Sequence, residues 1–310
     1  MPASLDTLKT RARIVQQIRA FFARQDFLEV DTPLLGISTN TDVHIQSITA
    51  RVNGETMYLQ TSPEFAMKQL LAEGSGSIYQ IAHAFRDEER GRRHHPEFSL
   101  LEWYSVGFNY RQLMDQLQQL IVELSNNEPA FQRLTYYSAF EQVLGVNLRD
   151  AGVETCQQLV QQHVPGIDAQ TLNRDQCLDL LISEVVSKQF SGFTFIYDYP
   201  ASQAALARLC ANDPALAERF ELFYNDMELA NGFGELTDAV EQRQRFEADN
   251  RKRAEQGLAE YPIDEAFLNA LAQGLPDCSG VALGLDRLLM VMQSFDHIEQ
   301  ALSLDTSQCR

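Results

Sequence analysis

Apolar residues along the chain follow two spacings, one typical of helices and one typical of strands. Over residues 5–24 they recur every three or four positions, as at Ile14 and Ile18, which predicts an amphipathic helix. An extended stretch that contains Pro33 follows over residues 27–35. Runs rich in aromatic and β-branched residues predict further strands over residues 56–63, 77–88, 98–106, 193–199 and 219–228.

Helical spacing returns in the middle of the chain and at its end. It predicts a helix over residues 113–124 and two or three amphipathic helices between residues 135 and 190. Residues 238–257 are strongly charged and have few apolar positions, so we expect an exposed helix there. The segment SGVALGLDRLLMVMQS, residues 279–294, predicts a buried strand that leads through glycines into an apolar helix.

The number of predicted strands favours an α+β fold over an all-helical bundle. The segment NGFGEL, residues 231–236, and the polar residues 89–97 are typical of hairpin connections. Such connections favour a mostly antiparallel β-sheet flanked by helices. Because no internal repeat, low-complexity segment or proline-rich linker divides the chain, we expect a single domain over residues 1–310.

Composition narrows the class of protein. The 310 residues are 45% hydrophobic, which is enough for a large core, and they carry a formal net charge of −18. Such an acidic chain repels polyanions, so stable tRNA binding is not expected. No signal-peptide pattern and no membrane-spanning apolar run occurs, so neither export nor membrane insertion is expected. The cysteines lack metal-ligand spacing and fit reduced thiols in a cytoplasmic protein: Cys156, Cys177, Cys210, Cys278 and Cys309.

Two segments concentrate side chains that could bind a charged ligand. FRDEERGRRHHPEF, residues 85–98, places an arginine and two acids at a strand end, followed by arginines and histidines. GVALGLDRLLM, residues 280–290, has two glycines that let the backbone approach a ligand, and Arg287 could stack on a base or pair with phosphate. Taken alone, the first is equally consistent with a solvated loop, and the second with a packed core turn.

A third segment, ELFYNDMELANGFGEL over residues 221–236, carries three regularly spaced acids. Glu221, Glu228 and Glu235 follow one another at intervals of seven positions. Paired carboxylates beside phosphates suit Mg²⁺, which prefers hard oxygen ligands. Seven is odd, so strict strand alternation would put these acids on opposite faces, and a bulge or bend is required if they share a site. A surface strand with acidic residues is the alternative interpretation.

Together these segments resemble the three sequence motifs of class II aminoacyl-tRNA synthetases. FLEVDTPLL, residues 27–35, resembles motif 1, which forms much of the homodimer interface in that family. FRDEE with HPEF resembles motif 2, and GVALGLDRL resembles motif 3. The lysine branch of the family is indicated by TSPEFAMKQLL (61–71), LEWY (101–104) and ELANGFGELTDA (228–239). The resemblance spans essentially the whole chain and implies formation of an aminoacyl-adenylate from ATP.

One difference from complete lysyl-tRNA synthetases concerns the start of the chain. The helix before motif 1 begins within the first dozen residues, so we expect no anticodon-binding domain. In this respect the chain resembles the EpmA family (PoxA, GenX, YjeA), the elongation factor P–(R)-β-lysine ligases. That resemblance implies activation of (R)-β-lysine or lysine and its transfer to a lysine side chain of elongation factor P. A truncated lysyl-tRNA synthetase and a catalytically silent regulatory module remain as alternatives.

The resemblance implies a role for each matching residue at the nucleotide. Arg86 would bind the α-phosphate of ATP and Arg287 the γ-phosphate, as the two catalytic residues, with the adenine between Phe98 and Arg287. Glu221 and Glu228 would hold Mg²⁺. The other residues implied at the nucleotide are Asp87, Glu88, His95, Glu228, Leu229 and Gly284.

The resemblance also implies a pocket for an amino acid with two amino groups. Glu64 would bind the amino group near the carboxylate, and several acidic or hydroxyl side chains would bind the distal ammonium. A neutral or acidic amino acid would leave these buried carboxylates unpaired, so the pocket selects lysine-like substrates. The residues implied here are Ser62, Pro63, Glu64, Glu102, Tyr104 and Glu235.

Two positions differ from the usual pattern of lysyl-tRNA synthetases. His95 stands where an asparagine usually contacts ATP, and Ala282 stands where motif 3 usually has a glycine. The added methyl group of Ala282 could favour the displaced amino group of a β-amino acid. The arginines and histidines of residues 90–95 form the one basic cluster of an acidic chain, and we expect elongation factor P to bind there.

Overall fold

The computed structural model describes residues 3–87, 89–125 and 128–304. The chain divides into two compact units, of which the first comprises Met1–Asn126 with Glu235–Arg310 and the second Asn127–Gly234. Both units combine helices with mainly antiparallel strands, so the predicted α+β class is confirmed. No helix within the described ranges is both long and apolar enough to cross a lipid bilayer.

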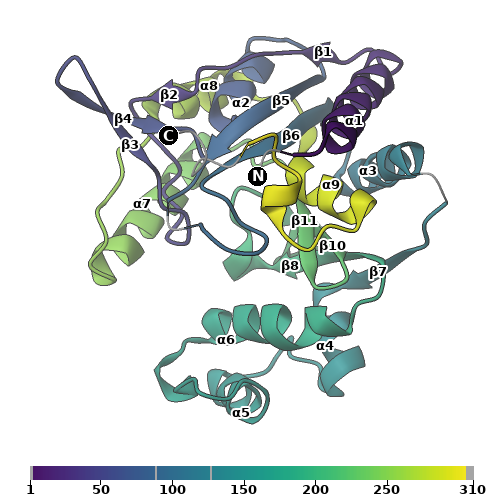
Figure 1. Ribbon diagram of the computed structural model, residues 1–310. Coiled ribbons are helices and arrows are strands. Elements are labelled where there is room, and N and C mark those ends of the chain that lie inside the picture. The colour runs from purple at the N-terminus through teal and green to yellow at the C-terminus, as the bar shows by residue number, and fades with distance from the viewer. Residues whose placement is uncertain (1–2, 88, 126–127, 305–310) are drawn as a thin grey trace. The chain divides into compact units, whose positions relative to one another are not determined.

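Four strands of the first unit pair in the order β1-β5-β6-β12, and Figure 1 shows β5 and β6 side by side. The short strand β1 runs parallel to β5, and the other two pairings are antiparallel. A smaller sheet has the order β2-β4-β3. The strands of this unit are β1 (Leu28–Glu29), β2 (Leu35–Gly36), β3 (Thr49–Val52), β4 (Glu55–Leu59), β5 (Ile78–Phe85), β6 (Glu97–Val106) and β12 (Cys278–Gly284).

The helices of the first unit begin at recognisable caps. The hydroxyl of Ser4 accepts a hydrogen bond from Thr7 N at the start of α1, and Asn109 forms a capping box with Gln112 at the start of α3. Helices α2 and α8 pack side by side (Figure 1). The helices are α1 (Leu5–Ala23), α2 (Glu64–Ala72), α3 (Tyr110–Leu124), α7 (Ala239–Glu255), α8 (Glu265–Gly274), α9 (Leu285–Gln293) and the 3-10 turn η5 (Ile298–Gln300).

The strands of the second unit pair in the order β11-β10-β8-β7, with β9 beside β10. Aromatic rings fill its core, as where Tyr136 packs against Tyr199 with 4.7 Å between ring centroids. Its strands are β7 (Phe131–Thr135), β8 (Phe193–Pro200), β9 (Leu209–Cys210), β10 (Asp213–Tyr224) and β11 (Met227–Gly234). Its helices are α4 (Tyr136–Leu144), α5 (Val153–His163), α6 (Arg174–Leu181) and the short turns η1 (Ala169–Thr171), η2 (Ile182–Val186), η3 (Ser187–Gln189) and η4 (Ala201–Gln203).

Three of the predictions about local structure are wrong. The strand predicted over 219–228 is two strands, because Asn225 adopts a positive φ of 50° and the chain turns between β10 and β11. The segment NGFGEL is not a hairpin connection, since most of it lies in β11. The helix predicted as exposed over 238–257 is α7, which buries Phe246 and Arg253.

Strand β6 uses its two faces differently because side chains alternate along a strand. On one face, Trp103 packs against Phe22 of α1, and its Nε1 donates a hydrogen bond to Gln116 of α3 at 2.9 Å. Phe98, Glu102 and Tyr104 lie on the other face, as their even spacing requires. One face of β6 therefore holds helices, and the other carries residues that are predicted to bind ligands.

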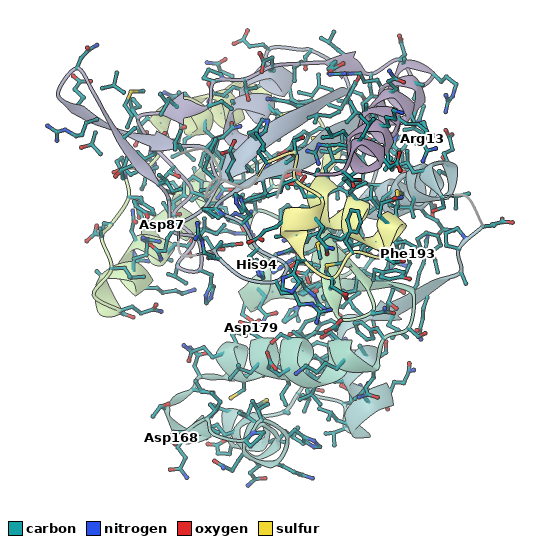
Figure 2. The ribbon with its side chains drawn as sticks, viewed as in Figure 1. Arg13, Asp87, His94, Asp168, Asp179 and Phe193 are labelled. Atoms are coloured by element: carbon teal, nitrogen blue, oxygen red, sulfur yellow. The ribbon has the colours of Figure 1, made fainter. Side chains whose placement is uncertain are left out.

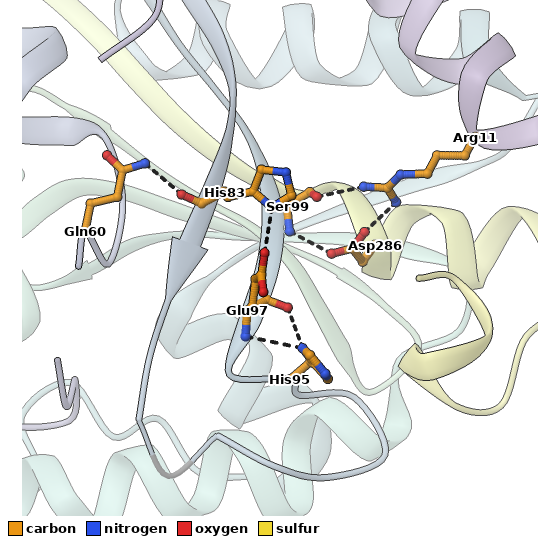
Figure 3. A network of polar contacts seen from close by, with 7 residues as sticks. All are labelled: Arg11, Gln60, His83, His95, Glu97, Ser99 and Asp286. Carbon is orange, nitrogen blue, oxygen red and sulfur yellow. Dashed lines mark hydrogen bonds and ion pairs between the residues drawn. The ribbon is translucent and has the colours of Figure 1, made fainter. Parts of the chain in front are cut away.

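A buried ion pair connects α1, β6 and α9 (Figure 3). Arg11 donates from Nη1 to Asp286 Oδ1 at 2.5 Å and from Nη2 to Ser99 Oγ at 2.7 Å. The backbone N–H of Ser99 donates to the other oxygen of Asp286 at 2.7 Å. Ser99 directly follows Phe98, and Asp286 directly precedes Arg287. Phe98 and Arg287 are both predicted to bind ATP. The ion pair therefore fixes the backbone on which those two side chains are carried.

Replacing Arg11 with methionine should destabilise the protein strongly. The side chain of Asp286 is only 2% exposed, and removal of its partner leaves a buried charge, which costs about 3 kcal/mol. Urea unfolding monitored by circular dichroism measures the change. The matched control is Arg19→Met on the same helix, whose exposed pair with Glu29 should cost about 0.5 kcal/mol. Equal losses for the two variants would contradict this assignment.

Candidate active site

Three charged side chains meet inside the first unit, on and beside α2. Glu64 is the first residue of α2, and Lys68 follows one helical turn later, so both lie on the same side of the helix. The ammonium of Lys68 lies 2.6 Å from Glu64 Oε1 and 2.6 Å from Glu235 Oε2. Lys68 and Glu235 are each 1% exposed. The structure therefore brings two of the predicted amino-acid-binding carboxylates together around one lysine.

A third carboxylate, Glu102, lies on β6 near this cluster. Its Oε1 accepts a hydrogen bond from the hydroxyl of Tyr104 at 2.7 Å, and its Oε2 is buried with no hydrogen-bond partner among the described residues. Burial raises the pKa of Glu102 to about 8, and the neighbouring Glu64 carboxylate adds to the rise. A buried acceptor without a donor fits the ammonium of a ligand.

The backbone of β12 approaches these side chains closely. Gly280 pairs with Tyr104 across the sheet, and a Cβ atom at Gly280 would lie 2.3 Å from the Tyr104 ring and 2.5 Å from Glu235 Oε1. A glycine is therefore required here for steric reasons. Ala282 pairs with Glu102 and lies on the same face as Gly280, so its methyl group is beside the carboxylate cluster.

Ser62 and Pro63, the remaining residues predicted for the amino acid, precede α2. The hydroxyl of Ser62 accepts a weak hydrogen bond from Glu64 N at 3.4 Å. Both residues line a groove of about 540 Å³. Its other lining residues are 31–33, 35–40, 58, 60, 61, 65, 66, 69, 70 and 262–266. None of the other predicted site residues lines this groove.

The residues predicted to bind ATP lie around the connection between β5 and β6. Arg86 follows β5, and its guanidinium lies 5.1 Å from the centre of the Phe98 ring, on the opposite strand of the hairpin. Its backbone N–H donates to Pro96 O at 3.0 Å. Arg86 Nε is buried with no hydrogen-bond partner among the described residues. The arrangement presents a donor beside a flat aromatic ring, as a nucleotide requires.

Arg287 lies in the first turn of α9 and contacts the same connection. Its Nε donates to Arg93 O at 3.1 Å. Partial burial lowers the pKa of His94, and Arg287, Arg86 and Arg93 lower it further, against the opposing effect of Glu89. Arg86 and Arg287 are thus both near His94, which Figure 2 labels on this connection together with Asp87. Such a cluster of guanidinium groups suits a polyphosphate.

Other residues predicted at the nucleotide are placed as follows. Nδ1 of His95 accepts from Glu97 N at 3.2 Å, within a network that also joins Glu97 to His83 (Figure 3). Gly284 ends β12 and precedes α9. Asp87 N donates to Gln46 O at 2.8 Å. Glu88 lies outside the described residues.

The predicted metal ligands Glu221 and Glu228 lie on neighbouring strands of the second unit. Glu221 pairs with Asn231, but Glu228 pairs with Phe223, because the register shifts between Leu222 and Phe223. The shift leaves Leu229 as an extra residue of β11 and turns Glu228 to the face of Glu221. The bulge required by the odd spacing of these acids is therefore present.

The carboxylate pair fits a hard divalent cation. Burial raises the pKa of Glu221, and the negative charge of Glu228 adds to the rise. Arg219 Nη2 binds Glu221 Oε1 at 2.5 Å, and the Tyr199 side chain also acts on this carboxylate. No group of three or more acidic, histidine or cysteine side chains in the described part could hold a metal ion. Two carboxylates with phosphate oxygens and water match Mg²⁺.

Lys68, which pairs with two of the predicted substrate-binding carboxylates, was not predicted from the sequence. The available signal was the spacing of four between Glu64 and Lys68, which is typical of an ion pair on a helix. No helix was predicted over residues 64–72, so this spacing could not be interpreted.

Comparisons with known proteins agree on one family. The model for tRNA synthetases class II (D, K and N) matches residues 2–306. A protein of Pseudoalteromonas translucida named elongation factor P–(R)-β-lysine ligase is 46% identical, over 99% of this chain and 97% of its own length. Proteins of the same name from Vibrio atlanticus and Vibrio cholerae are 45% and 46% identical, each over 96% of this chain and 94% of their own length.

Binding of a ligand with two ammonium groups should tighten as pH rises towards 8. Below its pKa of about 8 Glu102 is protonated, and pairing with an ammonium requires loss of that proton. The affinity for lysine should therefore rise by up to about tenfold per pH unit between pH 6 and 8, then level off. Calorimetric titration measures it, with Glu102→Gln as the variant that should bind weakly and without this pH dependence. A wild-type affinity that stays constant from pH 6 to 8 would contradict the prediction.

Proposed function

We propose that this chain, which belongs to the class II tRNA synthetases and among them to the elongation factor P–(R)-β-lysine ligases, activates (R)-β-lysine or lysine with ATP and transfers it to elongation factor P. The acceptor is the ε-amino group of one lysine of that protein. The products are an amide bond, AMP and diphosphate.

The observation that carries this proposal is the cluster of carboxylates beside Lys68. Glu64 and Glu235 pair with Lys68, their charges act on the nearby buried Glu102, and Glu102 Oε2 has no hydrogen-bond partner among the described residues. Such a pocket offers negative charge to two ammonium groups, and a substrate without them would leave buried carboxylates uncompensated. The pocket therefore supports a diamino acid as substrate.

The nucleotide residues support activation by ATP. The substrate carboxylate attacks the α-phosphorus, the bond to the β-phosphate oxygen breaks, and diphosphate leaves. This step needs positioning and compensation of negative charge more than a protein nucleophile. Arg86 and Arg287 supply donors to the phosphates, and Phe98 supplies an aromatic face for the adenine.

Glu221 and Glu228 are proposed to hold Mg²⁺, which would neutralise phosphate charge when bound. Arg219 holds one oxygen of Glu221, so this carboxylate is oriented before any cation arrives. The guanidinium of Arg219 lies 4.4 Å from the Tyr199 ring centre, and its Nη1 donates to Gln203 O at 2.7 Å. The protein thereby fixes the direction of one metal ligand.

In the second step the acceptor amine attacks the acyl carbonyl and AMP leaves. A lysine ammonium has a pKa of about 10.4 in water, so the acceptor must lose a proton before it attacks. The basic connection of residues 89–97 is proposed to contact elongation factor P. Arg92 supports this role, because its side chain is 60% exposed while its backbone O accepts from Ile298 N at 2.9 Å. The net charge of −18 supports the absence of stable tRNA binding.

We also propose that the chain forms a homodimer through the motif 1 region and acts as a single catalytic domain in the cytoplasm. Large apolar side chains are exposed there, with Leu28 at 55% and Ile37 at 75%. Ile37 lines the groove that Ser62 and Pro63 also line, and burial of such exposed apolar side chains by a second copy would be favourable. Cys156 and Cys177 are buried free thiols, which supports a reducing compartment.

The activity is tested by pyrophosphate exchange with ATP and either lysine isomer. Addition of elongation factor P or tRNA and measurement of intact masses then identifies the acceptor. We expect exchange, and a mass gain on elongation factor P alone. Charging of tRNA would instead support a truncated synthetase, and absence of exchange with both isomers would support a silent module.

Reversal of charge at Arg90 and Arg92, two exposed positions of the basic connection, should impair transfer but not activation. The double variant Arg90→Glu, Arg92→Glu should slow modification of elongation factor P by about tenfold or more, because charge complementarity governs association. Pyrophosphate exchange should change little. The control with the same change in net charge is Arg51→Glu, Arg251→Glu, at two exposed positions elsewhere. Transfer rates that are equal in the two double variants would exclude this docking surface.

A further inference from the structure

Lys68 is a cation inside a pocket that is proposed to bind cations. Its side chain is 1% exposed, and it contacts two of the three carboxylates offered to the substrate. The Lys68 ammonium therefore competes with the substrate's ammonium groups for the carboxylates of Glu64 and Glu235. The ammonium also lies 5.8 Å from the centre of the Phe267 ring, on α8. Lys68 is thus held between the two carboxylates and the Phe267 ring.

The surroundings of Lys68 explain how a buried ammonium keeps its charge. Burial by itself lowers the pKa of Lys68, but the carboxylates of Glu235 and Glu64 raise it more, so the net shift is upward. One N–H of the ammonium donates to Glu64 Oε1, and the ion pair with Glu235 Oε2 is equally short, at 2.6 Å. Lys68 consequently holds one oxygen of each carboxylate at a fixed distance from its own Nζ.

The charge of the pocket depends on this lysine. Glu64, Glu102 and Glu235 carry three negative charges when ionised, and Lys68 leaves two of them uncompensated. An acyl group with two ammonium groups matches those two charges. Without Lys68, three carboxylates would lie in one desolvated pocket, where like charges raise one another's pKa and protons are shared.

We propose that Lys68 is a positioning residue that keeps Glu64 and Glu235 ionised and correctly spaced, so that the pocket accepts two ammonium groups. The inference rests on the proposed function, because it assumes a diamino acid as the substrate. Five titratable groups face one another in this cluster: Lys68 and Glu64 from α2, Glu235 after β11, and Glu102 with its partner Tyr104 from β6. Of the carboxylates, only Glu102 then changes its protonation when the substrate binds.

Removal of this charge should alter substrate binding more than catalysis. In Lys68→Met, Glu64 and Glu235 should share a proton at neutral pH, and binding of lysine should require its release in addition to that of Glu102. The KM for the amino acid at pH 7 should rise tenfold or more, while the KM for ATP and kcat change less. Between pH 6 and 8, log KM should fall with rising pH by up to about one per pH unit in the wild type and by closer to two per pH unit in Lys68→Met. Pyrophosphate exchange measures both slopes.

The chain offers a matched control in Lys188→Met. Lys188 forms an ion pair of the same helical spacing with Glu184 at 2.7 Å, but its side chain is 51% exposed. This variant should keep the wild-type KM and pH slope. A Lys68→Met protein with wild-type KM and slope would overturn the inference, since a purely structural lysine would not control the protonation of the pocket.

A measurement on the wild-type protein covers the case in which Lys68→Met does not fold. Calorimetric binding of lysine at pH 7, in buffers of different ionisation enthalpy, counts the protons released. We expect release of no more than about one proton, from Glu102. Release of two would show that Glu64 or Glu235 is protonated in the free pocket and would overturn the inference. Absence of exchange in the wild type with either isomer would instead refute the proposed function.

Discussion

Strand β6 must carry charge into the interior of the first unit without leaving that charge unpaired. Its two faces meet this constraint in different ways. On the helix side, Ser99 shares Asp286 with Arg11, so every charge of that group is compensated within the chain. On the other side, Glu102 keeps one buried oxygen without a partner among the described residues. Most buried polar groups of native proteins have partners, so this unpaired carboxylate oxygen supports the assignment of that face of β6 to a ligand.

In the second unit, a β-bulge places two acidic side chains on one face of the sheet. Ordinary alternation would direct Glu221 and Glu228 to opposite faces, where they could not share a cation. The extra residue Leu229 in β11 corrects this, and it is itself buried. Arg219 then orients Glu221 through a short ion pair. A bulge is favourable here because the loss of regular pairing is offset by a pair of acids on one face.

Sequence patterns were sufficient where a single element decides the outcome. The apolar spacing of α1, α3 and β6 was strong enough to locate them, and the odd spacing of Glu221 and Glu228 required a bulge that is present. They failed at the turn of Asn225, which has apolar residues on both sides and no glycine. They also missed the role of Lys68, because its pairing with Glu235 depends on segments far apart in the chain. The family resemblance supplied residue roles, but not this contact.

The separation of Phe98 and Glu102 along β6 also limits the length of a ligand that contacts both residues. Phe98 and Glu102 are four residues apart on one face, which corresponds to about 13 Å along an extended strand. Guanidinium groups surround the Phe98 end, and carboxylates surround the Glu102 end. A molecule with a phosphate at one end and an ammonium at the other is oriented by this opposition of charge alone. An extended diamino acyl chain joined to a phosphate spans such a distance, so a single rigid strand can fix both direction and length.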